Sequence, residues 1–547
     1  MTIWKRPVLL ALASSAALLF PVNVSGGVGL LFNSQVNMTA PSAPAGMVDN
    51  FPSNKQIEPG IALDPTTGAL IAGAGDEIDE PLCTTTSTGT GSCPFVTGVG
   101  ISGVYLSNTG GSSWTQPSYT ESPKGTGTCL GRTIHTLPGY CEQSLESFAD
   151  SILAVGPALK NGKFSFANGS VVYYDNLAFP KGSATPVIAI SRSMNDGATW
   201  LAPVIASSSN NPVDFNDKDF VWADANPKSP FFGNVYATWT LFQGAGRGSP
   251  EPIVFARSTD GGQTWTAVMR LSQSVNNVAV GGRQGSFIRT GPDGTVYVFW
   301  EGAIFRHSEQ LVAISHDGGT TFSRPIPVAA VNDIPSPLPG SSFRDNSFPA
   351  ADVNQVTGAV YVVWANEEGS PPTALIKFTE SDNGGLTWSP PRTIGGRAGA
   401  FNAYFPAVAA SPDGAHVFVG WPVQTWVVAG TKPGANVVHD FAAFNLRTNS
   451  NGVWAGAALV STASGDPDGS STNGLAAQFL GDYTGAVANN GTGWFIWSDT
   501  RNETACAAVD AFRAGTGPKP NPDTACPPSA TGQLFGNTDI FVGAVGF

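Results

Sequence analysis

An eight-residue segment recurs along this chain and constrains its fold more than any other feature. Three copies share one template: STDGGQTW (258–265), SHDGGTTF (315–322) and SDNGGLTW (381–388). Two looser copies are SMNDGATW (193–200) and SNTGGSSW (107–114). Their first serines stand at positions 107, 193, 258, 315 and 381, so the intervals are 86, 65, 57 and 66 residues. Copies at such near-regular spacing predict a repeat architecture with one structural unit per copy.

A second element, a turn followed by a β-branched and aromatic run, precedes the octamers. Four clear versions end in Trp: GNVYATW (233–239), GTVYVFW (294–300), GAVYVVW (358–364) and AHVFVGW (415–421). Weaker versions are GALIAGA (68–74), GSVVYYD (169–175) and GWFIWSD (493–499). Short strands of period two between Gly, Pro, Asn and Asp turns predict an all-β chain. We expect a β-propeller of four-stranded antiparallel blades, with seven blades favoured and six as the alternative.

The octamer itself predicts a hairpin turn rather than a catalytic motif. An Asp side chain at the third position accepts backbone N–H bonds in such turns, and glycine supplies the positive φ. This Asp is replaced by Asn195, Asn383 and Thr109 in three copies, which a turn tolerates and a catalytic carboxylate would not. We expect the terminal aromatic to pack between neighbouring blades, at Trp114, Trp200, Trp265, Phe322 and Trp388.

Composition and charge exclude two broad classes. The 547 residues are 41% hydrophobic, 10% aromatic and only 12% charged, which is enough apolar surface for a large core and excludes a disordered chain. The net charge of −13 makes a nucleic-acid partner unfavourable, because phosphate would be repelled.

The first 26 residues have the pattern of a secretory signal peptide. Lys5 and Arg6 precede an apolar run over 8–20, and small residues follow. The run is too short for a membrane span, and no later stretch reaches the ~18 apolar residues that a span requires. We therefore expect a signal peptide at 1–26, a single propeller domain with the octamer repeats at 27–547, and a secreted or periplasmic location.

The six cysteines fall in three close pairs. They are Cys83 with Cys93, Cys129 with Cys141, and Cys506 with Cys526. In an exported protein this pattern predicts disulfides that close surface loops, and proximity favours the three local pairings. We also expect the ring to close by pairing GVGLLFN (27–33) with DIFVGAVGF (539–547), because an open edge strand invites aggregation.

The octamers resemble the Asp-box, or BNR, repeats of the sialidase superfamily of β-propellers. Two further stretches, IEPGIALDPTTGALIAGAGDE (57–77) and FLGDYTGAV (479–487) with WSDTR (497–501), resemble exported bacterial sialidase-like proteins. The resemblance implies glycosidase chemistry at the central channel. Sialidases have an Arg-Ile-Pro motif, three arginines for the substrate carboxylate, a Tyr nucleophile assisted by Glu, and an Asp acid/base. In this chain Ile57-Glu58-Pro59 stands at the opening, and Arg-Ile-Pro occurs nowhere.

Polar residues in the loops that enter the innermost strands are the first set of candidates, because these loops converge on the channel of a propeller. They are Glu58, Asp150, Asp219, Arg283, Arg344, Asp345, Asn402, Tyr404 and Asp482. A second set follows the Trp-ending strands: Asp76, Glu77, Asp79, Glu80, Glu301, Glu367, Glu368, Asp499 and Arg501. The alternative is that these side chains only solvate the strand ends.

The resemblance assigns roles to some of these candidates. Asp76 lies where the acid/base loop is expected, Glu301 resembles a glutamate after the second strand, and Tyr404 or Tyr483 is a nucleophile candidate. We therefore predict Asp76, Glu301 and Tyr404 as catalytic. The predicted substrate-binding residues are Glu58, Arg283, Arg344, Asp345, Asp482 and Arg501. The acidic loops 75–80 and 464–470 also permit a calcium ion, whereas no other cofactor is indicated.

Two functions of different classes remain open at this stage. The first is an exported sialidase-like glycoside hydrolase that acts on terminal or acidic sugars at the central pocket. The second is a non-catalytic propeller that binds glycan or protein at the cell surface, and a purely structural surface protein is a third reading. The sequence leaves open whether the protein is an enzyme.

Overall fold

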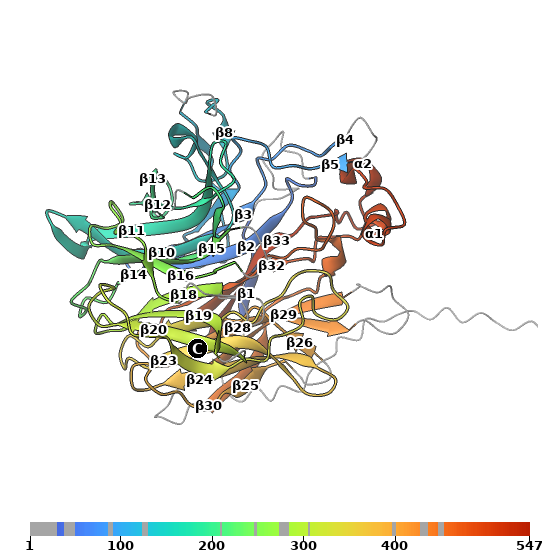
Figure 1. Ribbon diagram of the computed structural model, residues 1–547. Helices are drawn as coiled ribbons and strands as arrows, with labels where there is room; N and C mark the ends of the chain where they lie inside the picture. The colour runs from blue at the N-terminus through green and yellow to red at the C-terminus, as the bar shows by residue number, and fades with distance from the viewer. Residues whose placement is uncertain are drawn as a thin grey trace, which may run out of the picture.

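The computed structural model describes residues 30–37, 50–85, 91–122, 129–207, 211–244, 249–272, 284–304, 307–396, 401–426, 436–446 and 453–547. This part of the chain is built mainly of antiparallel strands (Figure 1). Two short helices, α1 (Ala507–Arg513) and α2 (Pro522–Ala525), lie together at one side of the molecule. The predicted signal peptide, residues 1–26, lies outside the described residues.

Seven antiparallel sheets form the blades of a β-propeller, which confirms the predicted fold class and the count of seven. Blade 1 contains β2 (Gln56–Leu63), β3 (Leu70–Asp76) and β6 (Ser102–Ser107). Blade 2 contains β10 (Ile152–Lys160), β11 (Lys163–Pro180), β12 (Val187–Ser193) and β13 (Leu201–Ile205), with β9 (Leu145–Ser147) beside β11. Blade 3 contains β14 (Asp214–Ala223), β15 (Val235–Gln243), β16 (Ile253–Ser258) and β17 (Met269–Arg270).

The remaining blades follow the same order along the chain. Blade 4 contains β18 (Gln284–Thr290), β19 (Val296–Ile304), β20 (His307–Ser315) and β21 (Ile326–Ala330). Blade 5 contains β22 (Ala350–Val353), β23 (Val360–Glu368), β24 (Thr373–Ser381) and β25 (Arg392–Gly395). Blade 6 contains β26 (Phe401–Ala403), β27 (Ala407–Ala410), β28 (His416–Trp426), β29 (Asn436–Leu446) and β30 (Val453–Leu459). Blade 7 contains β31 (Gly485–Ala488), β32 (Thr492–Asp499), β33 (Asp539–Gly546) and β1 (Leu30–Gln35).

The innermost strands of neighbouring blades contact each other in a closed circle, in the order β2, β10, β14, β18, β22, β27, β31 and back to β2. The circle closes within blade 7, where β1 pairs with β33 as predicted. Side chains reinforce this pairing, because Arg501 donates to Asn33 Oδ1 at 3.0 Å and holds Asp499 at 2.7 Å. The ring is therefore locked by the two ends of the described chain.

Blade 1 departs from the expected four strands. In the described residues its sheet has three strands, and the fourth is reduced to a single bridge between Leu106 and Thr115. Pro117 follows two residues later and has no N–H to donate to a ladder. The small hairpins β4 (Thr84–Thr85) with β5 (Gly91–Ser92) and β7 (Tyr119–Thr120) with β8 (Thr133–Ile134) lie outside the blade sheets, as do the 3-10 turns η1 (Cys141–Gln143) and η2 (Pro467–Gly469).

Each octamer forms the turn after the third strand of its blade, and its hydrogen bonds are nearly identical in all five copies. The first serine hydroxyl accepts the N–H of the fifth-position glycine at 2.8–2.9 Å, for example Gly262 to Ser258. The third side chain accepts the N–H of the seventh residue at 2.8–3.0 Å, whether it is Asp260, Asn195 or Thr109. The replacements thus keep the bond, as expected for a turn.

The terminal aromatics of the octamers are half-buried and pack against the blade cores. Phe322 of blade 4 contacts Phe255 of blade 3, with ring centroids 4.8 Å apart. Trp388 of blade 5 lies 6.2 Å from Phe299 of blade 4. These rings therefore join neighbouring blades, as the sequence predicted.

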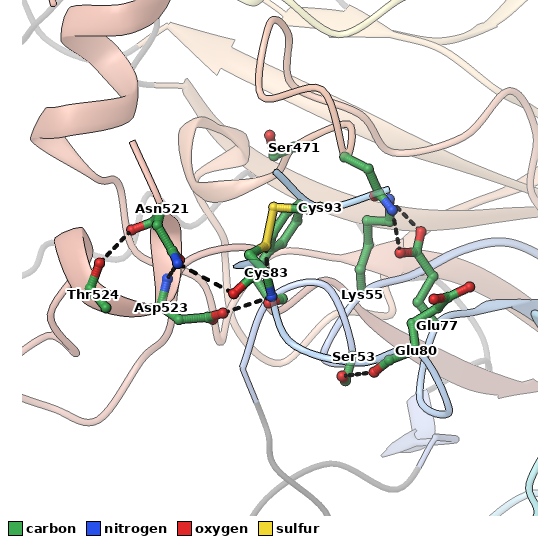
Figure 2. Close-up of a disulfide and its surroundings, with 12 residues drawn as sticks. Ser53, Lys55, Glu77, Glu80, Cys83, Cys93, Ser471, Asn521, Asp523 and Thr524 are labelled. Atoms are coloured by element: carbon green, nitrogen blue, oxygen red, sulfur yellow. Dashed lines mark hydrogen bonds and ion pairs between the residues drawn. A yellow bond between two sulfur atoms is a disulfide. The ribbon is translucent and has the colours of Figure 1, made fainter. Parts of the chain in front are cut away.

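All three predicted disulfides are present, at Cys83–Cys93, Cys129–Cys141 and Cys506–Cys526. The Asp523 carboxylate accepts the Cys83 N–H at 3.0 Å, and Asn521 donates to the Cys83 carbonyl, so α2 is held against the blade 1 loop (Figure 2). Three disulfides are typical of an oxidising environment. In the described residues no helix is both long and apolar enough to cross a membrane.

The octamer geometry predicts that Asp260→Ala destabilises the fold by about 1 kcal/mol, because the turn loses a side-chain acceptor for two backbone N–H groups. Asp260→Asn keeps the acceptor and should be nearly neutral. The measurement is the melting temperature of both variants against wild type. Equal losses for Ala and Asn would contradict the capping role and point to a role for the charge.

Candidate functional site

Each blade has one residue at a fixed position of its innermost strand or just before that strand. It stands two residues before the position where regular pairing begins or, after a bulge, resumes. We call the seven residues the rim residues: Glu58, Asp150, Lys218, Gly285, Phe348, Phe405 and Tyr483. The repeat thus places one such residue per blade at the same end of the ring, in sequence order around it.

Five rim residues have a positive φ, with values of 55° at Glu58, 66° at Asp150, 53° at Lys218, 72° at Gly285 and 42° at Phe405. Four of them carry side chains, for which this backbone region is strained. Strained residues persist only where the surroundings hold them, and they cluster at functional sites. The rim therefore marks a candidate site by backbone geometry alone.

A small pocket, with a cavity volume of about 40 Å³, lies among the strand entrances of blades 2 to 7. Its lining includes five rim residues: Lys218, Gly285, Phe348, Phe405 and Tyr483. Phe220, Phe287, Asn346 and Asp482 also contribute. An apolar, aromatic wall with a few polar groups is typical of a small-molecule site.

Four interacting carboxyl groups, Glu58, Asp150, Asp217 and Asp482, lie beside this pocket, and of these four Asp482 belongs to its lining. Burial raises the pKa of Glu58 well above its usual range, and the charges of Asp150 and Asp482 raise it further. Burial also raises the pKa of Asp150. The pKa of Asp217 rises to about 7 through burial and the charges of Asp150 and Asp482. Carboxyls in such surroundings hold their protons near neutral pH, as general acids do.

Two cations balance part of this acidity. Arg344 forms a bidentate ion pair with Asp482, with Nε to Oδ1 at 2.7 Å and Nη2 to Oδ2 at 2.5 Å. Lys218 is buried, and its Nζ lies 3.8 Å from the centroid of the Tyr483 ring. Among the described residues, the buried Tyr483 hydroxyl has no hydrogen-bond partner, and burial raises its pKa well above the usual value. The Asp482 carboxylate is thus fixed by Arg344, whereas the described residues provide no partner for the Tyr483 hydroxyl.

The stretch FLGDYTGAV needs its first glycine for this arrangement. Gly481 has a φ of 87°, and a Cβ there would lie 2.3 Å from Cγ of Glu58. A side chain at position 481 would therefore displace Glu58 from the pocket rim. The two stretches that resemble sialidase-like proteins in the sequence meet at this contact.

A second pair of acids lies between blades 2 and 3. Asp175 on β11 and Asp219 on β14 are fully buried and face each other. Burial raises the pKa of Asp175 to about 8 and that of Asp219 well above its usual range. Neutral, protonated carboxyls can be buried at a much lower cost than ionised ones.

Three predicted carboxylates of the blade 1 loop are bonded to the protein itself. Asp76 is fully buried and accepts bonds from Gln56, Tyr105 and Gln116. Glu77 forms a buried ion pair with Lys55 at 2.5 Å, and Glu80 accepts the Val96 N–H; both lie near the Cys83–Cys93 disulfide in Figure 2. These groups hold the loop rather than line the pocket.

Most other predicted residues outside the rim are also engaged within the blades. Glu301 on β19 faces Asp333, and burial raises its pKa well above the usual range. Tyr404 lies in the core of blades 5 and 6, with Phe343 at 5.6 Å. Asp345 accepts the Leu338 N–H at 2.8 Å. Asp79 binds His135, Glu368 binds Lys377, and Arg501 binds Asp499, whereas Arg283 lies outside the described residues.

The structure thus brings together Glu58, Arg344 and Asp482 from the predicted binding set and Tyr483 from the nucleophile candidates, and it adds Asp217 and Lys218. The stretch NDKDF (216–220) carries the two acids and the lysine. In a regular strand, where side chains alternate between the two faces, Asp217 and Asp219 would lie on the same face. The bulge between Asp217 and Phe220 interrupts this alternation. Asp219 therefore turns to Asp175, and Lys218 faces the pocket.

The acidic loops suggested for calcium have their acids bonded to protein donors. Asp466 accepts the Asp468 N–H at 3.0 Å, and Asp468 accepts the Gln478 amide at 3.1 Å. Among the described residues, the group close enough to share one metal ion is Cys129, Cys141 and Glu142, in which both cysteines are in a disulfide. Calcium binding stays a prediction.

Comparison with protein-family models and with curated proteins finds no match. An alpha-L-arabinanase of Penicillium chrysogenum is similar in structure, with 14% identity over 72% of this chain and 94% of that chain and a TM-score of 0.43. A Hadza microbial sialidase shares 14% identity over 68% and 69%, with a TM-score of 0.40. An alpha-L-arabinofuranosidase of Fusarium graminearum shares 11% over 76% and 97%, with a TM-score of 0.43.

A sialidase thus stands among the similar structures. All three TM-scores are below 0.5 and all three identities are below 25%. We therefore draw no functional argument from these likenesses. The sheet topology supports the fold, and the pocket geometry has to support the function.

The buried acids predict that the fold loses stability as pH rises. Asp175 has a usual pKa of 3.8 and a folded pKa of about 8, so between these values the folded state binds more protons than the unfolded state and the free energy of unfolding falls with pH. Melting temperatures measured from about pH 5.5 to 8.5 should decrease. Asp175→Asn should reduce the slope by about one proton, or ~1.4 kcal/mol per pH unit.

A matched control is Asp317→Asn in the exposed octamer turn. Bonds from Thr321 lower the pKa of Asp317 to about 2, so this group is ionised in both states over the tested range and its replacement should leave the slope unchanged. An unaltered slope in Asp175→Asn would contradict the protonated state of the buried pair.

Proposed function

We propose that this protein is a glycoside hydrolase whose active site is the central pocket, with Glu58 as the proton donor. The three disulfides and the predicted signal peptide support action outside the cytoplasm. The similarity in fold alone does not support an activity, so the proposal rests on the residues of the pocket.

One observation carries the proposal: two neighbouring carboxyl groups have opposite environments. Glu58 is buried and its pKa is raised by burial and by neighbouring acids. Asp482 instead forms a bidentate ion pair with the guanidinium of Arg344. Most glycoside hydrolases need one carboxyl that gives a proton and one that stays charged, and the pocket supplies both.

The chemistry follows from these positions. Glu58 donates its proton to the glycosidic oxygen while the bond from this oxygen to the anomeric carbon breaks. The Asp482 carboxylate stabilises the positive charge that develops on the sugar ring. A water molecule then supplies hydroxide to the anomeric carbon and a proton to Glu58, which restores the acid. The Tyr483 hydroxyl, which has no hydrogen-bond partner among the described residues, would bond a sugar hydroxyl at the rim.

The occupied guanidinium of Arg344 favours an uncharged sugar over the acidic sugar that the sequence resemblance implies. Capture of a sugar carboxylate needs a free guanidinium group, and the guanidinium of Arg344 already holds Asp482. A neutral sugar needs no such group.

The test is hydrolysis of a panel of fluorogenic aryl glycosides, neutral and acidic, by wild type and Glu58→Gln. We expect turnover of a neutral glycoside and a loss of about 10²–10⁴-fold in kcat/KM in the variant, because the proton donor is removed. The matched control is Glu301→Gln, a buried carboxyl with a raised pKa that faces Asp333 outside the pocket. It should keep the wild-type rate.

Equal rates for Glu58→Gln and wild type would contradict the assigned role. No turnover of any glycoside, together with saturable binding of a neutral oligosaccharide, would instead support the non-catalytic glycan-binding propeller. Preferential turnover of the sialoside would contradict the preference for an uncharged sugar.

A further inference from the structure

Four phenylalanines form a continuous strip beside the pocket, and the proposed chemistry does not use them. We call them the phenylalanine strip: Phe95, Phe148, Phe179 and Phe215. Ring centroids are 4.9 Å apart between Phe95 and Phe148, 5.1 Å between Phe148 and Phe179, and 6.4 Å between Phe179 and Phe215. The strip runs from the blade 1 loop across blade 2 to the first strand of blade 3.

The two ends of the strip are open to solvent. Phe95 is 45% exposed and Phe215 is 38% exposed, whereas the two middle rings are half-buried. Leu82 and Val96 are exposed near one end and Val213 near the other. Scattered exposed apolar residues are normal, but a connected row of rings marks a binding surface.

The strip and the acids of the pocket lie on the same side of the blades. Phe215 and Asp217 occupy alternate positions of a regularly paired segment of β14, so their side chains share one face. Phe148 precedes the rim residue Asp150 by two positions, which is about 7 Å of extended chain. A ligand anchored at the rim would therefore continue over the strip.

We propose that the phenylalanine strip is a binding platform for an extended, uncharged glycan chain whose reacting end lies in the central pocket. This inference rests on the proposed function, because the pocket supplies the acid that acts on the chain. Sugar rings present apolar C–H faces that stack on aromatic rings, and their hydroxyl edges bond to polar groups. The substrate is therefore a polysaccharide or long oligosaccharide rather than a single terminal sugar.

Charge selects this occupant. The strip is bordered by Glu146, which is the register partner of Phe179 in the pairing of β9 with β11, and by Asp214, which precedes Phe215 on β14. Acids on both sides repel a polyanionic chain such as a polyuronate. A stable protein partner would need about 800 Å² of buried surface on this side, which a single row of rings does not supply.

The experiment compares long and short substrates on strip variants. Phe95→Ala and Phe215→Ala remove the exposed ends of the strip, and Leu386→Ala, 64% exposed in the blade 5 octamer, is the matched control. On a neutral oligosaccharide we expect KM to rise by about thirtyfold in the combined Phe variant, because each of the two lost stacking contacts accounts for about fivefold. The kcat/KM for the aryl monoglycoside should stay unchanged.

An equal decrease in kcat/KM on the long and short substrates, or no decrease on either, would contradict the proposed binding platform. The proposed hydrolase activity would be unaffected by that result. If no glycoside is hydrolysed, the proposed hydrolase activity is rejected, and binding to polysaccharides is measured instead. Retention on insoluble cellulose, xylan and mannan, with polygalacturonate as the acidic comparison, should then still depend on Phe95 and Phe215. Unchanged retention of the combined variant would contradict the inference. Loss of self-association in that variant would also contradict it and would indicate that the strip is a protein contact.

Discussion

Closure of the ring is the constraint on which the rest of the structure depends. Asn33 on β1 donates to the Val542 carbonyl on β33, a bond between positions 509 residues apart in sequence. Once these strands pair, seven innermost strands have to converge, and the residue before each strand has to face the middle. The octamer turns and their aromatic ends then fix the spacing of neighbouring blades. The site is thus a consequence of the closed ring and not of one local motif.

Convergence concentrates charge where burial is costly. Desolvation of an ionised carboxyl costs several kcal/mol unless it is paired, and the centre of the ring holds more acids than cations. The protein meets this cost in two ways. Asp482 is paired with Arg344, while burial keeps protons on Glu58 and on the Asp175–Asp219 pair. A centre built for stability alone would be apolar, so the retained acids point to chemistry.

The sequence predicts the fold much better than it predicts the site. Octamer repeats, strand periods and cysteine spacing are local signals, and they led directly to seven blades, three disulfides and ring closure. The sequence could predict that Glu58, Arg344 and Asp482 lie close together because each is at the entrance of an innermost strand. Lys218 and Asp217 were missed because a one-residue bulge, invisible in the pattern, reverses which side chains face the channel. Asp76 and Tyr404 looked polar and accessible, but tertiary bonds and packing draw them into blade interiors.

The most direct test of the central claim is a crystal structure with a short neutral oligosaccharide bound. The account predicts a sugar ring among the rim residues, within hydrogen-bond distance of the Glu58 carboxyl and the Tyr483 hydroxyl, with further rings over Phe148 and Phe179. A saccharide bound solely on the outer edge of a blade, with the pocket still filled only by water, would contradict it.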